Sequence, residues 1–205
     1  KDQKTDFCLG LKNFFNIADY ITVNISSPNT EGLRDFHDQE KLQDLLATLN
    51  KVKEENKNIT PLLLKVSPDI KENYISEIAE VATKNNISAV VLTNTTNSNR
   101  DNLKNKAKKE RGGLSGEPLQ QVSTSMIKQF YKQMNGKIPI IGVGGVNSGK
   151  SAYEKIIAGA SLLQLYTSFV YKGPSIAKDI KKELIQILKT EGVKSIKEIV
   201  GKDVS

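Results

Sequence analysis

The sequence contains one cysteine, Cys8, and one histidine, His37, among 205 residues. A single cysteine excludes a disulfide within the chain and is typical of a reducing compartment. These two residues are too few for a zinc site built from cysteine and histidine, so we expect no metal site. A serine–histidine–aspartate triad would depend on His37, which lies in a polar stretch and is expected at the surface.

Arginine is also scarce, and long apolar runs are missing. Only three of the 30 basic residues are arginines, although the formal net charge is +7. Arginine is the better residue for bidentate recognition of phosphates and bases, so we expect a lysine-rich surface and no nucleic-acid partner. No apolar run reaches the length of about 18 residues that a membrane-spanning helix needs. No signal peptide is visible, and the chain starts with Lys1 and not Met, so we expect an N-terminal portion to precede it.

The sequence does contain a regular alternation of apolar runs and amphipathic stretches. Five near-continuous apolar runs lie at residues 20–25, 61–66, 89–93, 138–143 and 161–166. Such runs are typical of strands that are buried on both faces in a parallel sheet. Between them, apolar residues recur at helical spacing. One helix followed by five strand–helix units predicts an α/β fold with a parallel sheet.

Two architectures of this class compete, an open doubly wound sheet and a (β/α)8 barrel. The fourth run ends in a turn with Gly144 and Gly145, and the fifth ends at Tyr166 and Thr167. Glycines and hydroxyls before a helix start match the phosphate site after the seventh and eighth strands of a barrel. We therefore expect one domain over residues 1–205 that holds about the last five barrel units and lacks the first three.

Polar residues interrupt or close three of these strands at the carboxyl end, where barrel active sites lie. Asn24 interrupts an apolar strand, although asparagine is disfavoured there; it could bind a ligand or only satisfy barrel backbone. Lys65 follows three leucines, which is costly unless it is paired, with Asp69 for example, or faces a ligand. The stretch Thr93-Asn94-Thr95-Thr96 suits a polar planar ligand but could also be a plain turn.

A long polar segment, Asn94–Gly116, follows the third strand and carries a cluster of lysines. A loop of about 20 residues inside a compact domain is usually functional or mobile. We expect Asn97–Arg111 to be mobile or to form a lid over the active site.

These strand ends supply amides, hydroxyls, one lysine and a glycine turn suited to a phosphate, but no histidine base. This set fits a flavin mononucleotide (FMN) site better than a hydrolytic site. At these positions the sequence resembles the dihydroorotate dehydrogenases. The matching motifs, in the family's order, are Asn24-Ile25-Ser26-Ser27-Pro28-Asn29-Thr30 with Gly32-Leu33-Arg34, Leu64-Lys65-Val66-Ser67-Pro68-Asp69, Thr93-Asn94-Thr95-Thr96, Gly112-Gly113-Leu114-Ser115-Gly116, Gly142-Val143-Gly144-Gly145-Val146 and Gln164-Leu165-Tyr166-Thr167. Each motif is weak by itself, but together they cover essentially the whole chain.

The resemblance implies a role for each matched position. Ser27 matches the catalytic base, and Thr30 is a candidate for its proton relay. The positions that match orotate-binding residues are Asn24, Asn29, Asn94 and Thr95. The positions that match FMN-binding residues are Asn24, Lys65, Thr93, Gly116, Gly144, Gly145, Tyr166 and Thr167. Serine at position 27 implies the membrane-associated, quinone-reducing type, because the soluble types carry cysteine there.

The implied activity is the oxidation of dihydroorotate to orotate in pyrimidine synthesis, with FMN as cofactor and a quinone as acceptor. Ser27 would remove the proton at C5 while hydride passes from C6 to flavin N5. The family's first strands and its N-terminal membrane-contacting segment are not in this sequence, so we expect the chain alone to be inactive. With that segment, the enzyme would lie at the cytoplasmic side of a bacterial inner membrane or at the mitochondrial inner membrane. Two alternatives remain open: another FMN-dependent barrel acting on dihydropyrimidines or dihydrouridine, and a non-catalytic basic binding module.

Overall fold

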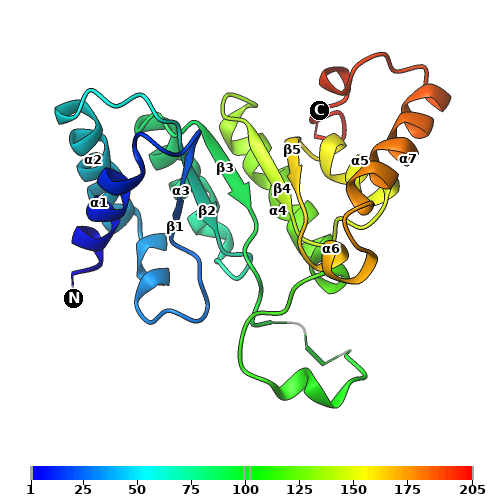
Figure 1. Ribbon diagram of the computed structural model, residues 1–205, viewed down its shortest axis with the longest axis horizontal. Coiled ribbons are helices and arrows are strands. Elements are labelled where there is room, and N and C mark those ends of the chain that lie inside the picture. The colour runs from blue at the N-terminus through cyan, green and yellow to red at the C-terminus, as the bar shows by residue number, and fades with distance from the viewer. Residues whose placement is uncertain (1, 99, 102, 205) are drawn as a thin grey trace.

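The structure is a computed structural model that describes residues 2–98, 100–101 and 103–204. Its centre is a parallel sheet of five strands, each lying next to its predecessor in the chain (Figure 1). The strands are β1 (Ile21–Asn24), β2 (Leu62–Val66), β3 (Ala89–Leu92), β4 (Ile140–Val143) and β5 (Ala160–Gln164). A doubly wound sheet reverses its strand order at a switch point. The uninterrupted order from β1 to β5 is instead that of a barrel wall, as predicted.

Helices connect the strands and cover one face of the sheet. They are α1 (Gln3–Phe14), α2 (Gln39–Glu55), α3 (Glu72–Lys84), α4 (Gln120–Met134), α5 (Gly149–Ile157), α6 (Thr167–Lys172) and α7 (Ile176–Thr190), with 3₁₀ helices η1 (Leu33–His37), η2 (Lys106–Lys109), η3 (Glu117–Leu119) and η4 (Ile196–Glu198). Local sequence sets their starts. The Asp38 side chain, for example, accepts hydrogen bonds from the backbone N–H groups of Glu40 and Lys41 and so caps α2.

The two faces of the sheet carry different side chains because successive residues of a strand point to opposite sides. Leu64, Val90 and Ile140 belong to the main core, which the helices cover. On the other face, Leu63 and Val91 belong to a smaller apolar cluster. Lys65 shares this second face with Leu63, and Asn24 is its register partner on β1. The predicted site residues on β1 and β2 therefore lie side by side on the face that the helices leave open.

The outer strands β1 and β5 form the two edges of the sheet. Leu162 on β5 is 61% exposed, and Tyr20, in the run that contains β1, is 50% exposed. The prediction that all five runs are buried on both faces is therefore wrong for the first and the fifth. A strand at an open edge has a neighbour on only one side, and burial on the other side requires further strands. The strands are also shorter than the apolar runs, and β5 ends at Gln164, before Tyr166.

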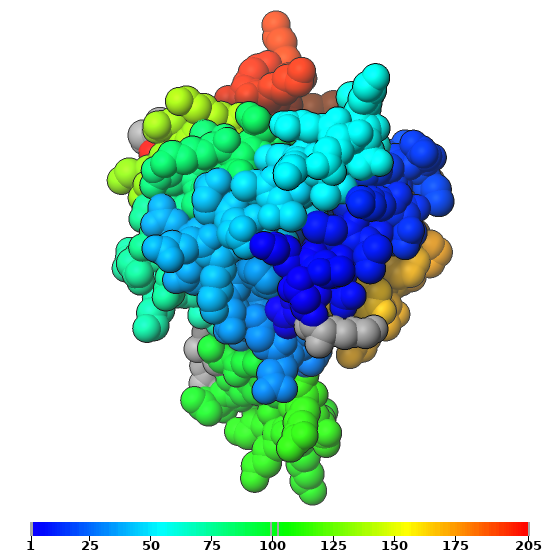
Figure 2. Space-filling model, turned by 90° about the vertical axis from the view of Figure 1, so that its left-hand side faces the viewer, coloured from blue at the N-terminus to red at the C-terminus, as the bar shows by residue number. Residues whose placement is uncertain are grey.

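The long segment after β3 projects from the end of the sheet where the strands terminate (Figures 1 and 2). The Arg100 guanidinium donates to the backbone carbonyls of Lys108, Glu110 and Gly112 and holds the segment together. Positions 99 and 102, which belong to the predicted lid, lie outside the described residues. Within the described part of the chain, no helix has both the length and the apolar character required to cross a bilayer.

Candidate active site

The carboxyl ends of β2 to β5 border a cavity of about 630 Å³. Sites for small molecules and cofactors have volumes of about 300–1,000 Å³. Nine of the twelve predicted site residues line this cavity, namely Lys65, Thr93, Asn94, Thr95, Gly116, Gly144, Gly145, Tyr166 and Thr167. The other three, Asn24, Ser27 and Asn29, lie outside the lining, at the end of β1 and in the loop that follows it.

Lys65 is half-buried, and its side chain reaches the cavity. Within the described residues its ammonium group has no hydrogen-bond or ion-pair partner. The alternative salt bridge to Asp69 is not formed, because the Asp69 carboxylate binds Arg34 at 3.1 Å instead. Burial lowers the pKa of Lys65. A half-buried cation without a counter-charge can stabilise negative charge on a bound ligand.

Another part of the cavity wall is a glycine turn after β4. Gly144 and Gly145 have φ angles of +111° and +74°, which L side chains rarely adopt. A Cβ at position 145 would lie 2.7 Å from Cα of Gln120, so only glycine lets the turn rest against the start of α4. The hydroxyls of Ser115 and Thr167 lie 2.9 Å apart and join the loop before η3 to the start of α6. Turns of this kind present backbone N–H groups, which suit an anionic group.

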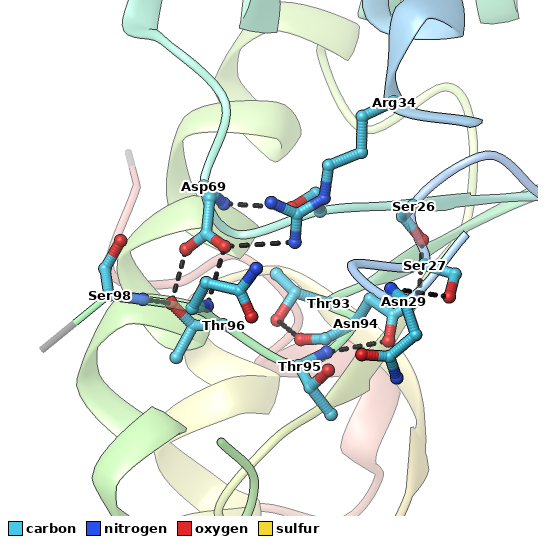
Figure 3. A network of polar contacts seen from close by, with 12 residues as sticks. Ser26, Ser27, Asn29, Arg34, Asp69, Thr93, Asn94, Thr95, Thr96 and Ser98 are labelled. Carbon is cyan, nitrogen blue, oxygen red and sulfur yellow. Dashed lines mark hydrogen bonds and ion pairs between the residues drawn. The ribbon is translucent and has the colours of Figure 1, made fainter. Parts of the chain in front are cut away.

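An amide network joins the ends of β1 and β3 (Figure 3). Asn94 Nδ2 donates to Asn24 Oδ1 at 3.2 Å and to Ser26 Oγ at 2.9 Å, and the backbone N–H of Thr95 donates to Asn94 Oδ1 at 2.8 Å. Both ends of the Asn94 amide are therefore held by the protein. Asn24 Oδ1 also accepts from the backbone N–H of Ser26 at 3.3 Å, so Asn24 does satisfy backbone. Its Nδ2 group has no partner among the described residues and is available to a ligand.

Ser27 lies in the loop after β1, where its Oγ accepts two hydrogen bonds. The donors are the hydroxyl of Thr30 and the backbone N–H of Asn29, each at 3.3 Å. Donors to an oxygen favour its more negative form and so lower the cost of removing its proton. Thr30 is exposed to solvent. The structure thus brings the predicted base and its candidate relay together.

Asp69 joins three loops, a role that the sequence analysis did not assign to it (Figure 3). Besides Arg34, its carboxylate binds the hydroxyl of Thr96 and the backbone N–H of Asn97, the latter at 2.9 Å. It therefore ties the segment after the Ser27 loop to the ends of β2 and β3. The sequence offered one signal for this role: Asp69 is an acid that directly follows a strand end, and the chain has few arginines with which it could pair.

His37 corrects one expectation. It was predicted at the surface, but only 7% of it is exposed, because η1 folds it inward beside Arg34 and Asp69. Burial, with a smaller contribution from the Arg34 charge, lowers its pKa to about 4. The imidazole is therefore neutral near pH 7 and lies outside the cavity lining.

The base of the long segment packs against predicted substrate residues. A Cβ on Gly113 would overlap the Thr95 side chain and lie 3.2 Å from Cγ of Pro28. The nearest atom to a Cβ on Gly112 would be Asn29 Oδ1, at 4.0 Å. The end of the segment thus passes between the Ser27 loop and the end of β3, and at position 113 there is no room for a Cβ.

Comparison with known proteins supplies the family. The sequence model described as dihydroorotate dehydrogenase matches residues 1–188. The chain belongs to the dihydroorotate dehydrogenase family. It is 42% identical to the mitochondrial dihydroorotate dehydrogenase (quinone) of Arabidopsis thaliana, over 99% of this chain and 45% of that protein. It is 44% identical to the dihydroorotate dehydrogenase (quinone) of Christiangramia forsetii, over 88% of this chain and 53% of that protein.

Two solved structures of dihydroorotate dehydrogenase from Eimeria tenella have the same fold. The ligand-free protein superposes with a TM-score of 0.92 at 34% identity, over 98% of this chain and 60% of that chain. The complex with ferulenol gives 0.94 at 33% identity, over 98% and 58%. These matches and the strand order confirm a partial (β/α)8 barrel. The chain spans about half the length of the curated relatives that it matches.

Proposed function

We propose that this chain forms the FMN-binding and substrate-binding part of a dihydroorotate dehydrogenase that reduces a quinone. The observation that carries the proposal is the cavity that connects an unpaired Lys65 with the glycine turn at Gly144 and Gly145. Family membership supports it. Ser27 and the names of the curated relatives support the quinone type.

The cavity lining fits FMN in its chemistry. A half-buried lysine without a carboxylate partner suits the ring edge that becomes negative on reduction. The glycine turns and hydroxyls that also line the cavity suit a phosphate. Lys65 and Thr93 would hold the ring, while the phosphate would be held by Gly116, Gly144, Gly145, Tyr166 and Thr167. FMN, when bound, supplies the acceptor for the hydride.

The residues proposed to hold orotate are amides and a hydroxyl: Asn24, Asn29, Asn94 and Thr95. Asn94 is fixed in one orientation by its bonds to Asn24, Ser26 and Thr95. A fixed amide loses little freedom when it binds a ligand, which favours binding and orientation. The free Nδ2 group of Asn24 can donate to a carbonyl of a planar heterocycle.

Ser27 is proposed to remove the C5 proton of dihydroorotate, which lies next to a carbonyl. A serine hydroxyl is a poor base and needs a path for its own proton. Thr30 provides that path, because its hydroxyl contacts Ser27 Oγ and is open to solvent. A hydroxyl can turn from donor to acceptor, so the same contact can carry the proton outward.

Reduction of a quinone requires access to a membrane, and we extend the proposal to peripheral membrane association. Five strands are too few to close a barrel of eight, so we also propose that these 205 residues are inactive alone. The experiment therefore uses the full-length protein. Under anaerobic conditions, dihydroorotate should bleach the flavin absorbance in a stopped-flow mixer, and a short-chain ubiquinone should restore it.

Two results would contradict this function. A full-length protein that binds no flavin would refute the proposed function altogether. If dihydroorotate reduces the flavin but only NAD, and not the quinone, reoxidises it, the protein is still a dihydroorotate dehydrogenase, but the proposed quinone acceptor is wrong. Added NAD is therefore the control acceptor in the same experiment.

A further inference from the structure

Lys155, on α5, is a completely buried lysine, with 0% of the residue exposed. Its Nζ donates to Ser123 Oγ at 3.0 Å and Thr124 Oγ1 at 3.1 Å, and more weakly to the Gln120 carbonyl at 3.4 Å. No carboxylate in the described part of the chain forms an ion pair with it. A buried charge without an ion-pair partner is costly. Burial lowers the pKa of Lys155 to about 7, and the charge of Glu154 opposes this shift to a smaller extent. Packing alone does not explain why a lysine is present here.

The ammonium group lies directly behind the glycine turn after β4. Ser123, which binds it, also donates its hydroxyl to the Val143 carbonyl. Gln120, which it also contacts, is the residue against which Gly145 packs. None of Lys155, Ser123 and Gln120 lines the cavity. One layer of residues therefore separates the Lys155 charge from the turn that faces the cavity.

The groups around Lys155 favour an anion in the cavity, on the other side of the turn. Helix α4 begins at Gln120, and the start of a helix carries a partial positive charge. When it is protonated, Lys155 adds a positive charge at the same place. The nearest acid on α5, Glu154, is engaged with the Gln120 side-chain amide at 2.7 Å. Two positive features side by side repel each other, and a bound dianion would compensate both.

We propose that Lys155 is a positioning residue whose buried charge, behind the turn formed by Val143, Gly144 and Gly145, favours a phosphate group in the cavity. The inference rests on the proposed function, because FMN is the ligand that brings the phosphate. In this proposal Lys155 does not contact the ligand. Its charge acts through the turn, and its bonds to Ser123 and Gln120 hold the turn against α4.

The test is Lys155→Met in the full-length protein, with Lys150→Met as its matched control. Lys150 lies on the same helix but is exposed, so both variants lose one charge from α5. Methionine keeps an unbranched chain of similar length. The Ser123 and Thr124 hydroxyls keep their bonds to the carbonyls of Val143 and Gln120, so the variant should fold.

The readout compares two flavins by fluorescence titration of the apoprotein. Lys155→Met should weaken FMN binding by about tenfold or more, because a unit charge acts strongly over short distances in a partly buried site. Binding of riboflavin, which has no phosphate, should change less than about twofold by the same Coulomb argument. At saturating FMN, the ³¹P resonance of the bound phosphate should shift, while the visible absorption of the ring stays unchanged. Lys150→Met should match the wild type in all three measurements.

Equal losses for FMN and riboflavin, or an unchanged ³¹P resonance, would overturn the inference and leave Lys155 a structural residue. Ser123→Ala gives an independent check if Lys155→Met does not fold. This variant keeps the Lys155 charge but removes the hydrogen bond to Val143. It should therefore weaken FMN binding less than Lys155→Met does and leave riboflavin binding unchanged. Equal losses of FMN and riboflavin affinity in Ser123→Ala would count against the inference as well. A wild-type protein that binds no FMN would instead refute the proposed function.

Discussion

Gly145→Ala tests whether the tight turn after β4 depends on glycine for its backbone and for its packing. Gly145 has a φ of +74°, and a Cβ there would lie 2.7 Å from Cα of Gln120 and 3.0 Å from its backbone nitrogen. Both contacts are with backbone, which cannot turn away as a flexible side chain can. The substitution must therefore move the turn or the start of α4.

The expected loss of stability has two parts. An alanine in the left-handed region costs roughly 1–2 kcal/mol. Overpacking against fixed neighbours adds about 1–3 kcal/mol. Gly192→Ala separates the two, because Gly192 has a similar φ of +70° and nothing within 4 Å of a Cβ. The control should therefore lose only the first part.

Urea unfolding of the full-length apoprotein measures both variants. The midpoint of Gly145→Ala should correspond to about 1–3 kcal/mol less stability than that of Gly192→Ala, with an unchanged m value. FMN affinity should fall in Gly145→Ala only, because the moved turn lines the cavity. Equal stabilities for the two variants would refute the close packing of Gly145 against α4. An unchanged FMN affinity in Gly145→Ala would remove this turn from the phosphate site.

Three further predictions concern the full-length protein. Ser27→Ala should slow flavin reduction by dihydroorotate by about 10²–10⁴-fold and leave orotate binding nearly unchanged, with the exposed Ser125→Ala as control; reduction at the wild-type rate would exclude Ser27 as the base. Lys65→Met should make the flavin harder to reduce, since a neutral side chain cannot stabilise the anionic reduced form, and an unaltered midpoint potential would contradict that role. His37 has its pKa lowered from 6.5 to about 4 by burial, so between these pH values the unfolded chain binds a proton that the folded chain does not. The free energy of unfolding should therefore fall as the pH drops from 6.5 to 4, by up to about 3 kcal/mol from this residue. His37→Leu should show a shallower fall, and parallel stability curves for the two proteins would argue against a buried neutral imidazole.

The positions of strands and the order of the fold were accessible from local patterns. Apolar runs mark buried strands because both faces of an inner strand exclude water, and β2, β3 and β4 lie where the runs predicted them. The glycine turn and the polar residues after β3 were also visible, because they interrupt those runs. The same reasoning was wrong about burial at Leu162, because an apolar run does not state whether a further strand covers it.

What the sequence determined by itself was the class of fold and nine of the residues that line the cavity, since both follow from periodicity and from the ends of parallel strands. Only the tertiary structure decided how buried charges are satisfied. Asp69 was a plausible partner of Lys65 by proximity in the chain, yet it binds Arg34, which lies 35 residues away. The local sequence does not mark Lys155 as buried, and its polar contacts come from Ser123 and Thr124 of α4, more than 30 residues earlier. The free energy of a charge depends on the atoms around it in space, and these come from segments that the sequence keeps far apart.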